Sequence, residues 1–208
     1  MKDFLTIKDK IFRHEFVVEK SRFISFACQV STVGQANFFI ESISKQHYDA
    51  THNCYAYLTD EGQKFSDDGE PQGTAGLPIL NAIKGKNLHN VAVVVTRYFG
   101  GVKLGAGGLV RAYSEAAAGA CANATVTRCV LCSKFRVDFS YENYKIFSNF
   151  RMPKYSKNLS IEYSDKVTVF FAVKKEECDS FVASFEDFYN KKQAIERLND
   201  IIYEFEEV

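Results

Sequence analysis

Apolar residues recur along the first half of the chain in patterns that predict a sheet with helices packed on it. They alternate with polar residues over 11–18 and 22–28, which predicts two adjacent strands or a hairpin. Over 35–46 they recur at helical spacing. The run Val-Ala-Val-Val-Val-Thr over 91–96 is apolar almost throughout, as expected of a central strand that is buried on both faces.

Weaker signals lie between these elements. Residues 52–59 are expected to form a short strand, and residues 60–73 a polar loop. Residues 76–85 are expected to form a helix. A glycine-rich loop over 98–108 should then lead into an alanine-rich helix over about 108–122.

The second half of the chain predicts a strand, a helix, two strands, a helix and a final strand. The strands are expected at about 134–140, 157–163, 167–173 and 200–206, and the helices at about 142–151 and 175–190. Phe135, Val137 and Phe139 alternate with charged residues and should face the core. This βαββαβ order is typical of a ferredoxin-like domain, so the predicted fold class is α+β.

Glycine supplies the signal for a domain boundary. All 12 glycines of the 208 residues lie between Gly34 and Gly119. This asymmetry predicts two domains, residues 1–130 and residues 131–208, joined near 128–133. A chain of this length can bury ordinary cores without disulfides or metals.

Composition and charge narrow the classes of function. Hydrophobic residues make up 46% and charged residues 25%, which excludes a disordered or collagen-like chain. No apolar run approaches the roughly 20 residues of a membrane helix, and the N-terminus does not resemble a secretory signal. We therefore expect a cytoplasmic protein without a membrane partner. The formal net charge of +0 requires that any anionic partner be held by a local patch.

The cysteines and histidines do not form a complete metal site. The six cysteines are scattered, and Cys129-x-x-Cys132 has no second pair to complete a zinc site. His47, His52 and Cys54 also lack a fourth ligand. We expect reduced, partly buried thiols, no structural metal, no disulfide and no cofactor.

The stretch from residue 97 to residue 111 has the residues of an anion site. It follows an apolar strand and precedes a helix, which is where phosphate-binding loops lie. It matches neither the Walker A nor the Rossmann pattern. The candidate anion- or nucleic-acid-binding residues are Arg97, Gly100, Gly101, Lys103, Gly105, Gly107, Gly108 and Arg111. Spacing alone leaves open a second interpretation, a tight strand-to-helix turn with close packing.

Two further features bear on this candidate site. Arg111 should lie in the first helical turn, where a cation conflicts with the helix dipole and an anionic partner would remove the conflict. Gly107 or Gly108 is expected to cap that helix. Asp67, Asp68 and Glu70 form an acidic segment that could hold Mg²⁺ or a basic group, or could be a turn ahead of a helix. We expect this segment to lie beside the glycine-rich loop on one exposed rim.

Four segments together resemble the IMPACT/YigZ family and cover about residues 16–122. They are Lys20-Ser-Arg-Phe-Ile24, His52-Asn-Cys54, the run from Phe65 to Gly76 with Pro78, and the run from Arg97 to Tyr113. The second half is similar to the bacterial YigZ-like branch in length and element order, without a sharp motif.

The resemblance implies a fold for each domain and a role in translation. The N-terminal domain should be a βα sandwich like the second domain of a ribosomal small-subunit protein, and the C-terminal domain should be similar to the last domain of elongation factor G. Eukaryotic relatives act in translational control through a kinase-activating partner. They use an additional partner-binding domain that we do not expect here, so that mechanism is not carried over. For the bacterial branch the resemblance implies nucleic-acid binding and no secure catalytic activity.

Three functions remain open on the sequence. The first is a non-catalytic protein that binds RNA or the ribosome through phosphate groups and regulates translation. The second is a magnesium-dependent enzyme acting on a phosphorylated small molecule, although no nucleophile or general base is evident. The third is a protein-interaction module in which the motifs serve only the fold.

Overall fold

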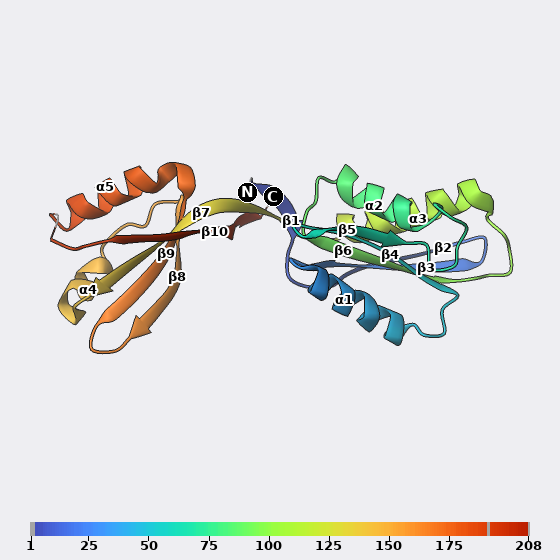
Figure 1. Cartoon of the computed structure of the whole chain (residues 1–208), viewed down its shortest axis with the longest axis horizontal. Coiled ribbons are helices and arrows are strands. Elements are labelled where there is room, and N and C mark those ends of the chain that lie inside the picture. The colour runs from blue at the N-terminus through green and yellow to red at the C-terminus, as the bar shows by residue number, and fades with distance from the viewer. Residues whose placement is uncertain (1–2, 191, 208) are drawn as a thin grey trace. The chain divides into compact units, whose positions relative to one another are not determined.

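The computed structural model describes residues 3–190 and 192–207, which form two compact units (Figure 1). Phe4–Arg128 belong to one unit and Cys129–Phe205 to the other. Each unit combines helices with a sheet, which confirms the α+β class. The chain passes from the first unit to the second within one long strand, β7 (Val126–Phe139), so residues 128–133 are strand and not a separate linker.

The N-terminal unit is built on an antiparallel sheet in the order β2-β3-β6-β4-β5. The strands of this sheet are β2 (Phe12–Val18), β3 (Ser21–Gln29), β4 (His52–Thr59), β5 (Gly62–Ser66) and β6 (Val91–Tyr98). Strand β1 (Phe4–Ile7) precedes them in the chain and is not part of this sheet. The helices of this unit are α1 (Val33–Gln46), α2 (Gly76–Gly85) and α3 (Gly105–Ala122).

Strand β6 is buried on both faces of this sheet, as its apolar run predicts. Val93 and Val95 belong to the core beneath α2 and α3. Ala92 and Val94 belong to the core on the opposite face, which α1 covers (Figure 1). The sheet is therefore the middle layer of three, and its central strand ends at the candidate site.

Two predicted boundaries in this unit are wrong. The polar segment 60–73 contains strand β5, which pairs with β4. Strand β5 is almost wholly exposed, so its sequence lacks the apolar alternation that marks a half-buried strand. Helix α3 begins at Gly105 and not near 108. Three glycines of the predicted loop thus lie in the first helical turn. Glycine has a low helix propensity, so the composition of this segment predicts a loop and not a helix.

The strand register places Arg97 between two other elements of the site. In the sheet, Arg97 lies opposite Phe23 of β3 on one side and opposite His52 of β4 on the other. The last residues of β6 and the first residues of β4 consequently lie at the same end of the sheet, near the start of α3.

The C-terminal unit has the element order βαββαβ. Strand β7 pairs with β9 and with β10, and β9 also pairs with β8. The elements are β7, α4 (Tyr141–Phe147), β8 (Ser156–Tyr163), β9 (Val167–Lys174), a 3₁₀ turn (Lys175–Glu177), α5 (Cys178–Phe188) and β10 (Glu196–Glu207). Both helices are shorter than predicted, and the first and last strands are longer.

One face of this second sheet carries the larger core, and a smaller buried cluster contains Val130, Cys132, Ala172 and Phe205. Phe135, Val137 and Phe139 of β7 are buried, as predicted, and pack with aromatic residues of both helices such as Phe147 and Phe181. None of the helices in the described part of the chain is both long enough and apolar enough to cross a bilayer.

Candidate functional site

A pocket of about 420 Å³ opens in the N-terminal unit where β6 ends and α3 begins. It brings together segments that are far apart in sequence. The lining residues are Thr51, His52, Glu70, Pro71, Arg97, Phe99, Lys103, Leu104, Gly105, Ala106 and Leu109. The acidic segment and the glycine-rich stretch thus meet at one pocket.

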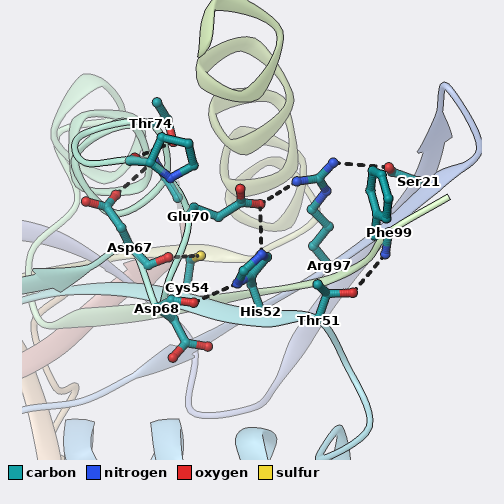
Figure 2. Close-up of polar contacts among 12 residues, drawn as sticks. Ser21, Thr51, His52, Cys54, Asp67, Asp68, Glu70, Thr74, Arg97 and Phe99 are labelled. Carbon is teal, nitrogen blue, oxygen red and sulfur yellow. Dashed lines mark hydrogen bonds and ion pairs between the residues drawn. The ribbon is translucent and has the colours of Figure 1, made fainter. Parts of the chain in front are cut away.

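Arg97 lies beneath this pocket, held by an ion pair. Its Nη1 donates to Glu70 Oε1 at 2.6 Å, and its Nη2 donates to Ser21 Oγ at 3.3 Å (Figure 2). The guanidinium also lies 5.5 Å from the ring centre of Phe23 and 5.4 Å from that of Phe99. With 5% of its surface exposed, Arg97 is part of the interior and not a free surface cation.

Glu70 is the centre of the buried polar network. Its Oε1 accepts a second hydrogen bond from the Tyr113 hydroxyl at 2.8 Å. Burial, together with the neighbouring Cys54 and Glu70, raises the pKa of Tyr113, so the phenol stays protonated and donates. Glu70 is 8% exposed, so the expectation that the whole acidic segment lies on an exposed rim is wrong at this residue.

His52 connects the network to the acidic turn. Its Nδ1 lies 2.7 Å from the carbonyl oxygen of Asp68. Because a carbonyl oxygen only accepts, Nδ1 carries the hydrogen in this contact. The other nitrogen, Nε2, lies 3.9 Å from Glu70 Oε1 (Figure 2).

Asp67 faces away from the pocket and caps helix α2. Its carboxylate accepts hydrogen bonds from the backbone N–H groups of Gly73, Ala75 and Gly76 at 2.8 to 3.0 Å. Burial alone would raise the pKa of Asp67, but these three donors outweigh it and lower the pKa. The helix has no side-chain cap of its own at Ala75, so Asp67 satisfies the free N–H groups from outside.

The three carboxylates of the acidic segment therefore serve three different partners. Asp67 binds backbone N–H groups, Glu70 binds Arg97, and Asp68 Oδ2 accepts from the backbone N–H of Asn53 at 2.6 Å. Within residues 3–190 and 192–207, no group of three or more His, Cys, Asp or Glu side chains is placed to hold a metal ion. The arrangement favours the interpretation of this segment as a turn.

The N-terminus of α3 opens toward the pocket without a side-chain cap. Its capping position is Leu104, which has no side chain able to accept a hydrogen bond, and its first turn holds no acidic residue. Gly105 and Ala106 are exposed and line the pocket, next to the exposed Lys103. Free N–H groups and a cation thus face the same space.

Arg111 differs from its prediction. Because α3 begins at Gly105 and is capped by Leu104, Arg111 falls in the second turn. The predicted conflict with the helix dipole is therefore absent, and neither Gly107 nor Gly108 is the cap. Arg111 lines a neighbouring pocket of about 400 Å³, together with Gly108, Glu115 and Lys103.

The glycines of the loop have separate roles. A Cβ on Gly100 would lie 2.0 Å from the backbone carbonyl of Lys20, so this glycine allows the loop to pass close to the β2–β3 turn. Gly101 and Gly105 have φ of +86° and +68° with open space around the Cβ position, so backbone conformation selects them. Gly105 therefore permits the turn that exposes the start of α3.

Several residues of the site were missing from the sequence prediction, and three of them matter most for its chemistry. Phe99 and His52 line the pocket, and Tyr113 donates to Glu70. Their positions inside the segments that carry the family resemblance were the available signal, because such segments mark residues near a shared site. Nothing in their local spacing indicates that they meet.

Comparison with known proteins finds a known domain in the same part of the chain. The family model of the Impact N-terminal domain matches residues 19–121, which include every residue of the pocket. The chain belongs to the IMPACT family. The family resemblance noted in the sequence is therefore confirmed.

Several IMPACT family members are similar to this chain. The member YvyE of Bacillus subtilis (strain 168) is 57% identical over 105 residues, covering 49% of this chain and 48% of its own. YigZ of Escherichia coli (strain K12) is 46% identical over 101 residues, covering 46% of this chain and 50% of its own. The chain thus spans about half the length of these curated relatives.

One solved structure aligns with nearly the whole IMPACT family chain. A crystal structure of a hypothetical protein is 28% identical, covers 96% of this chain and 98% of its own, and has a TM-score of 0.63. A structure described as the two-domain translational regulator Yih1 is 25% identical over 58% of this chain and 47% of its own, with a TM-score of 0.33. The first shares the fold through both units.

Proposed function

We propose that this IMPACT family chain binds phosphate groups of RNA or of the ribosome at the start of α3, without catalysis, and acts in translation regulation. The uncapped N-terminus of α3 carries the proposal, because it opens beside Lys103 into a pocket. Backbone N–H groups and the positive end of the helix dipole both favour an anion there.

The charges around the pocket are consistent with an anionic partner. Glu70 is neutralised by its ion pair with Arg97, so neither charge dominates the pocket. Lys103 is exposed and lines both this pocket and the neighbouring one, where Arg111 adds a second cation and Glu19 and Glu115 add two carboxylates. Because the net charge of the chain is +0, binding should depend on this local patch.

The family supports the choice of partner. The resemblance implies translational control for eukaryotic relatives and nucleic-acid binding for the bacterial branch. It also implies a first domain like one of a ribosomal small-subunit protein and a second like the last domain of elongation factor G. Those two likenesses stay predictions, and they favour RNA or the ribosome as the partner.

An enzyme acting on a phosphorylated small molecule is the second candidate. The observation that favours it is the pocket itself, in which His52 Nε2 lies 3.9 Å from Glu70. The acidic segment does not support a bound Mg²⁺, because each of its three carboxylates already accepts hydrogen bonds from a protein group. Turnover of a phosphorylated compound that is lost in His52→Ala would establish this candidate instead.

Salt-dependent RNA binding tests the first proposal. Affinity for a labelled RNA is measured between low and high salt for the wild type, Lys103→Ala and Arg111→Ala. The matched control is Lys45→Ala, which removes an exposed lysine of helix α1. Each phosphate contact that is lost should weaken binding and lower the salt slope by about one. Unchanged affinity and slope in both variants, with folding intact, would remove this patch from the binding surface.

A further inference from the structure

We infer that the pocket holds one unpaired nucleotide, with its phosphate at the N-terminus of α3 and its base against Phe99. This inference rests on the proposed function and specifies its ligand as single-stranded. The phosphate position is given by Lys103 and the free N–H groups of Gly105 and Ala106. The base position is given by Phe99 and by the apolar residues that line the rest of the pocket.

Phe99 is placed as a stacking surface. It lines the pocket with 46% of its surface exposed, so part of the residue is open to a ligand. Its backbone N–H donates to Thr51 Oγ1 at 3.0 Å, and its ring lies 5.4 Å from the Arg97 guanidinium (Figure 2). The hydrogen bond fixes the backbone at Phe99 and the guanidinium packs against the ring, so stacking a base on the ring costs little additional order.

The rest of the wall suits a flat, partly apolar group. Leu104, Leu109 and Pro71 supply apolar surface opposite the polar groups of the pocket. The volume of about 420 Å³ lies within the range of roughly 300–1,000 Å³ that is typical of small-ligand pockets. A single nucleotide can enter such a space, whereas a paired base inside a helix cannot.

Arg97 gives an independent indication of a ligand. It lines the pocket and is 5% exposed, yet its Nε is buried without a hydrogen-bond partner among the described residues. Buried donors of native proteins are nearly always satisfied. The atom is not exposed in this arrangement, so a ligand acceptor would reach it by drawing the Arg97 side chain toward the pocket.

RNA exposes a flat base that could enter this pocket only where the base is unpaired. The bases of a duplex are stacked and their grooves are read by shape, whereas single strands present bases that stack on aromatic side chains. A duplex could touch Lys103 and Arg111 through its phosphates, but it could not reach Phe99 with a base. The inference therefore predicts a preference that simple phosphate binding does not.

The experiment compares ligands and variants of the whole chain. Binding is measured for an eight-nucleotide single-stranded RNA, for a duplex of the same sequence, and for AMP and UMP as competitors. The variants are Phe99→Ala and Phe99→Tyr, with Phe38→Ala as control, because Phe38 is 78% exposed on helix α1 of the same unit. Thermal unfolding verifies that each variant is folded.

The expected result is a single-strand preference that depends on Phe99. Phe99→Ala should weaken single-strand binding by about 5- to 150-fold, the range for losing one base–aromatic stack, and should leave duplex binding unchanged. Phe99→Tyr should retain binding, and Phe38→Ala should have no effect. AMP or UMP should compete with the single strand.

The outcomes separate this inference from the proposed function. Equal binding of single strand and duplex, with no loss in Phe99→Ala, would overturn the nucleotide pocket and leave phosphate binding standing. Binding of AMP or UMP that depends on Phe99 and Lys103, with no RNA binding at low salt, would support the pocket and overturn the RNA function. Absence of binding to all of these ligands would overturn both.

Discussion

Arg97 and Glu70 form an ion pair of 2.6 Å between side chains that are only 6% and 4% exposed. The pair joins the end of β6 to the acidic turn before α2, across 27 positions of sequence. It changes the role expected for Arg97, because a guanidinium held in the interior by a carboxylate organises the pocket floor. Lys103 is then the exposed cation that faces the pocket.

Removing one member of this pair should be costly. Glu70→Ala leaves the Arg97 charge buried without its partner, and we expect a loss of about 3–5 kcal/mol in the free energy of unfolding. Denaturant titration followed by circular dichroism measures it. The double variant Glu70→Leu/Arg97→Met should lose less than the sum of the two single changes. Additive losses would show that the two side chains do not stabilise each other.

Asp67 should make the stability of the N-terminal unit depend on acid pH. Its folded pKa is lowered by backbone donors, so its contribution is fully present above the unfolded pKa of about 3.9 and is lost as the pH falls through the folded value. At pH 7, Asp67→Asn should lower the free energy of unfolding by about 0.5–2 kcal/mol, as for a lost helix cap. The difference from wild type should shrink as the pH falls from 5 toward 2.

The exposed carboxylate of Asp9 supplies the control for this measurement. Asp9→Asn should leave the unfolding free energy nearly unchanged at pH 7. A constant difference between wild type and Asp67→Asn across the acid range would contradict the capping role of the ionised carboxylate.

Two adjacent glycines should respond differently to alanine. Gly100→Ala would place a Cβ 2.0 Å from the backbone of Lys20, so the β2–β3 turn must move, with a loss of about 3 kcal/mol. Gly101→Ala meets open space at φ +86° and should cost only the left-handed strain of about 1 kcal/mol. Thermal unfolding compares the two variants. A larger loss for Gly101→Ala would show that the close approach at Gly100 is not limiting.

The thiols should react in the order of their accessibility. Cys28 is half-buried and the other five cysteines are buried. Burial raises the pKa of Cys54 to about 12, so its thiolate is scarce at pH 8. A thiol-specific reagent should label Cys28 first in the native protein, and Cys28→Ser should remove most of that labelling. Rapid labelling that persists in Cys28→Ser would contradict the buried placement of the others.

The sequence by itself determined most of the elements and the family. The continuous apolar run of β6, the helical spacing of α1 and α2, and the alternation of Phe135, Val137 and Phe139 are local patterns with a direct physical meaning. The exposed strand β5 and the glycine-rich start of α3 were not predicted, because their residues show neither the apolar alternation of a strand nor the apolar spacing of a helix. Because the start of α3 was missed, the sequence also placed Arg111 in the first helical turn when it lies in the second.

Only the tertiary structure decided which charged residues remain available to a ligand. In the sequence, Arg97, Lys103 and Arg111 are equivalent cations, and Asp67, Asp68 and Glu70 are equivalent carboxylates. The sheet register places Arg97 beside His52 and within reach of Glu70, and the two opposite charges pair because either one buried alone would be strongly destabilising. Asp67 is drawn instead to the N–H groups of α2. Lys103 is exposed at the pocket and forms no ion pair among the described residues, a relation between distant segments that local spacing does not encode.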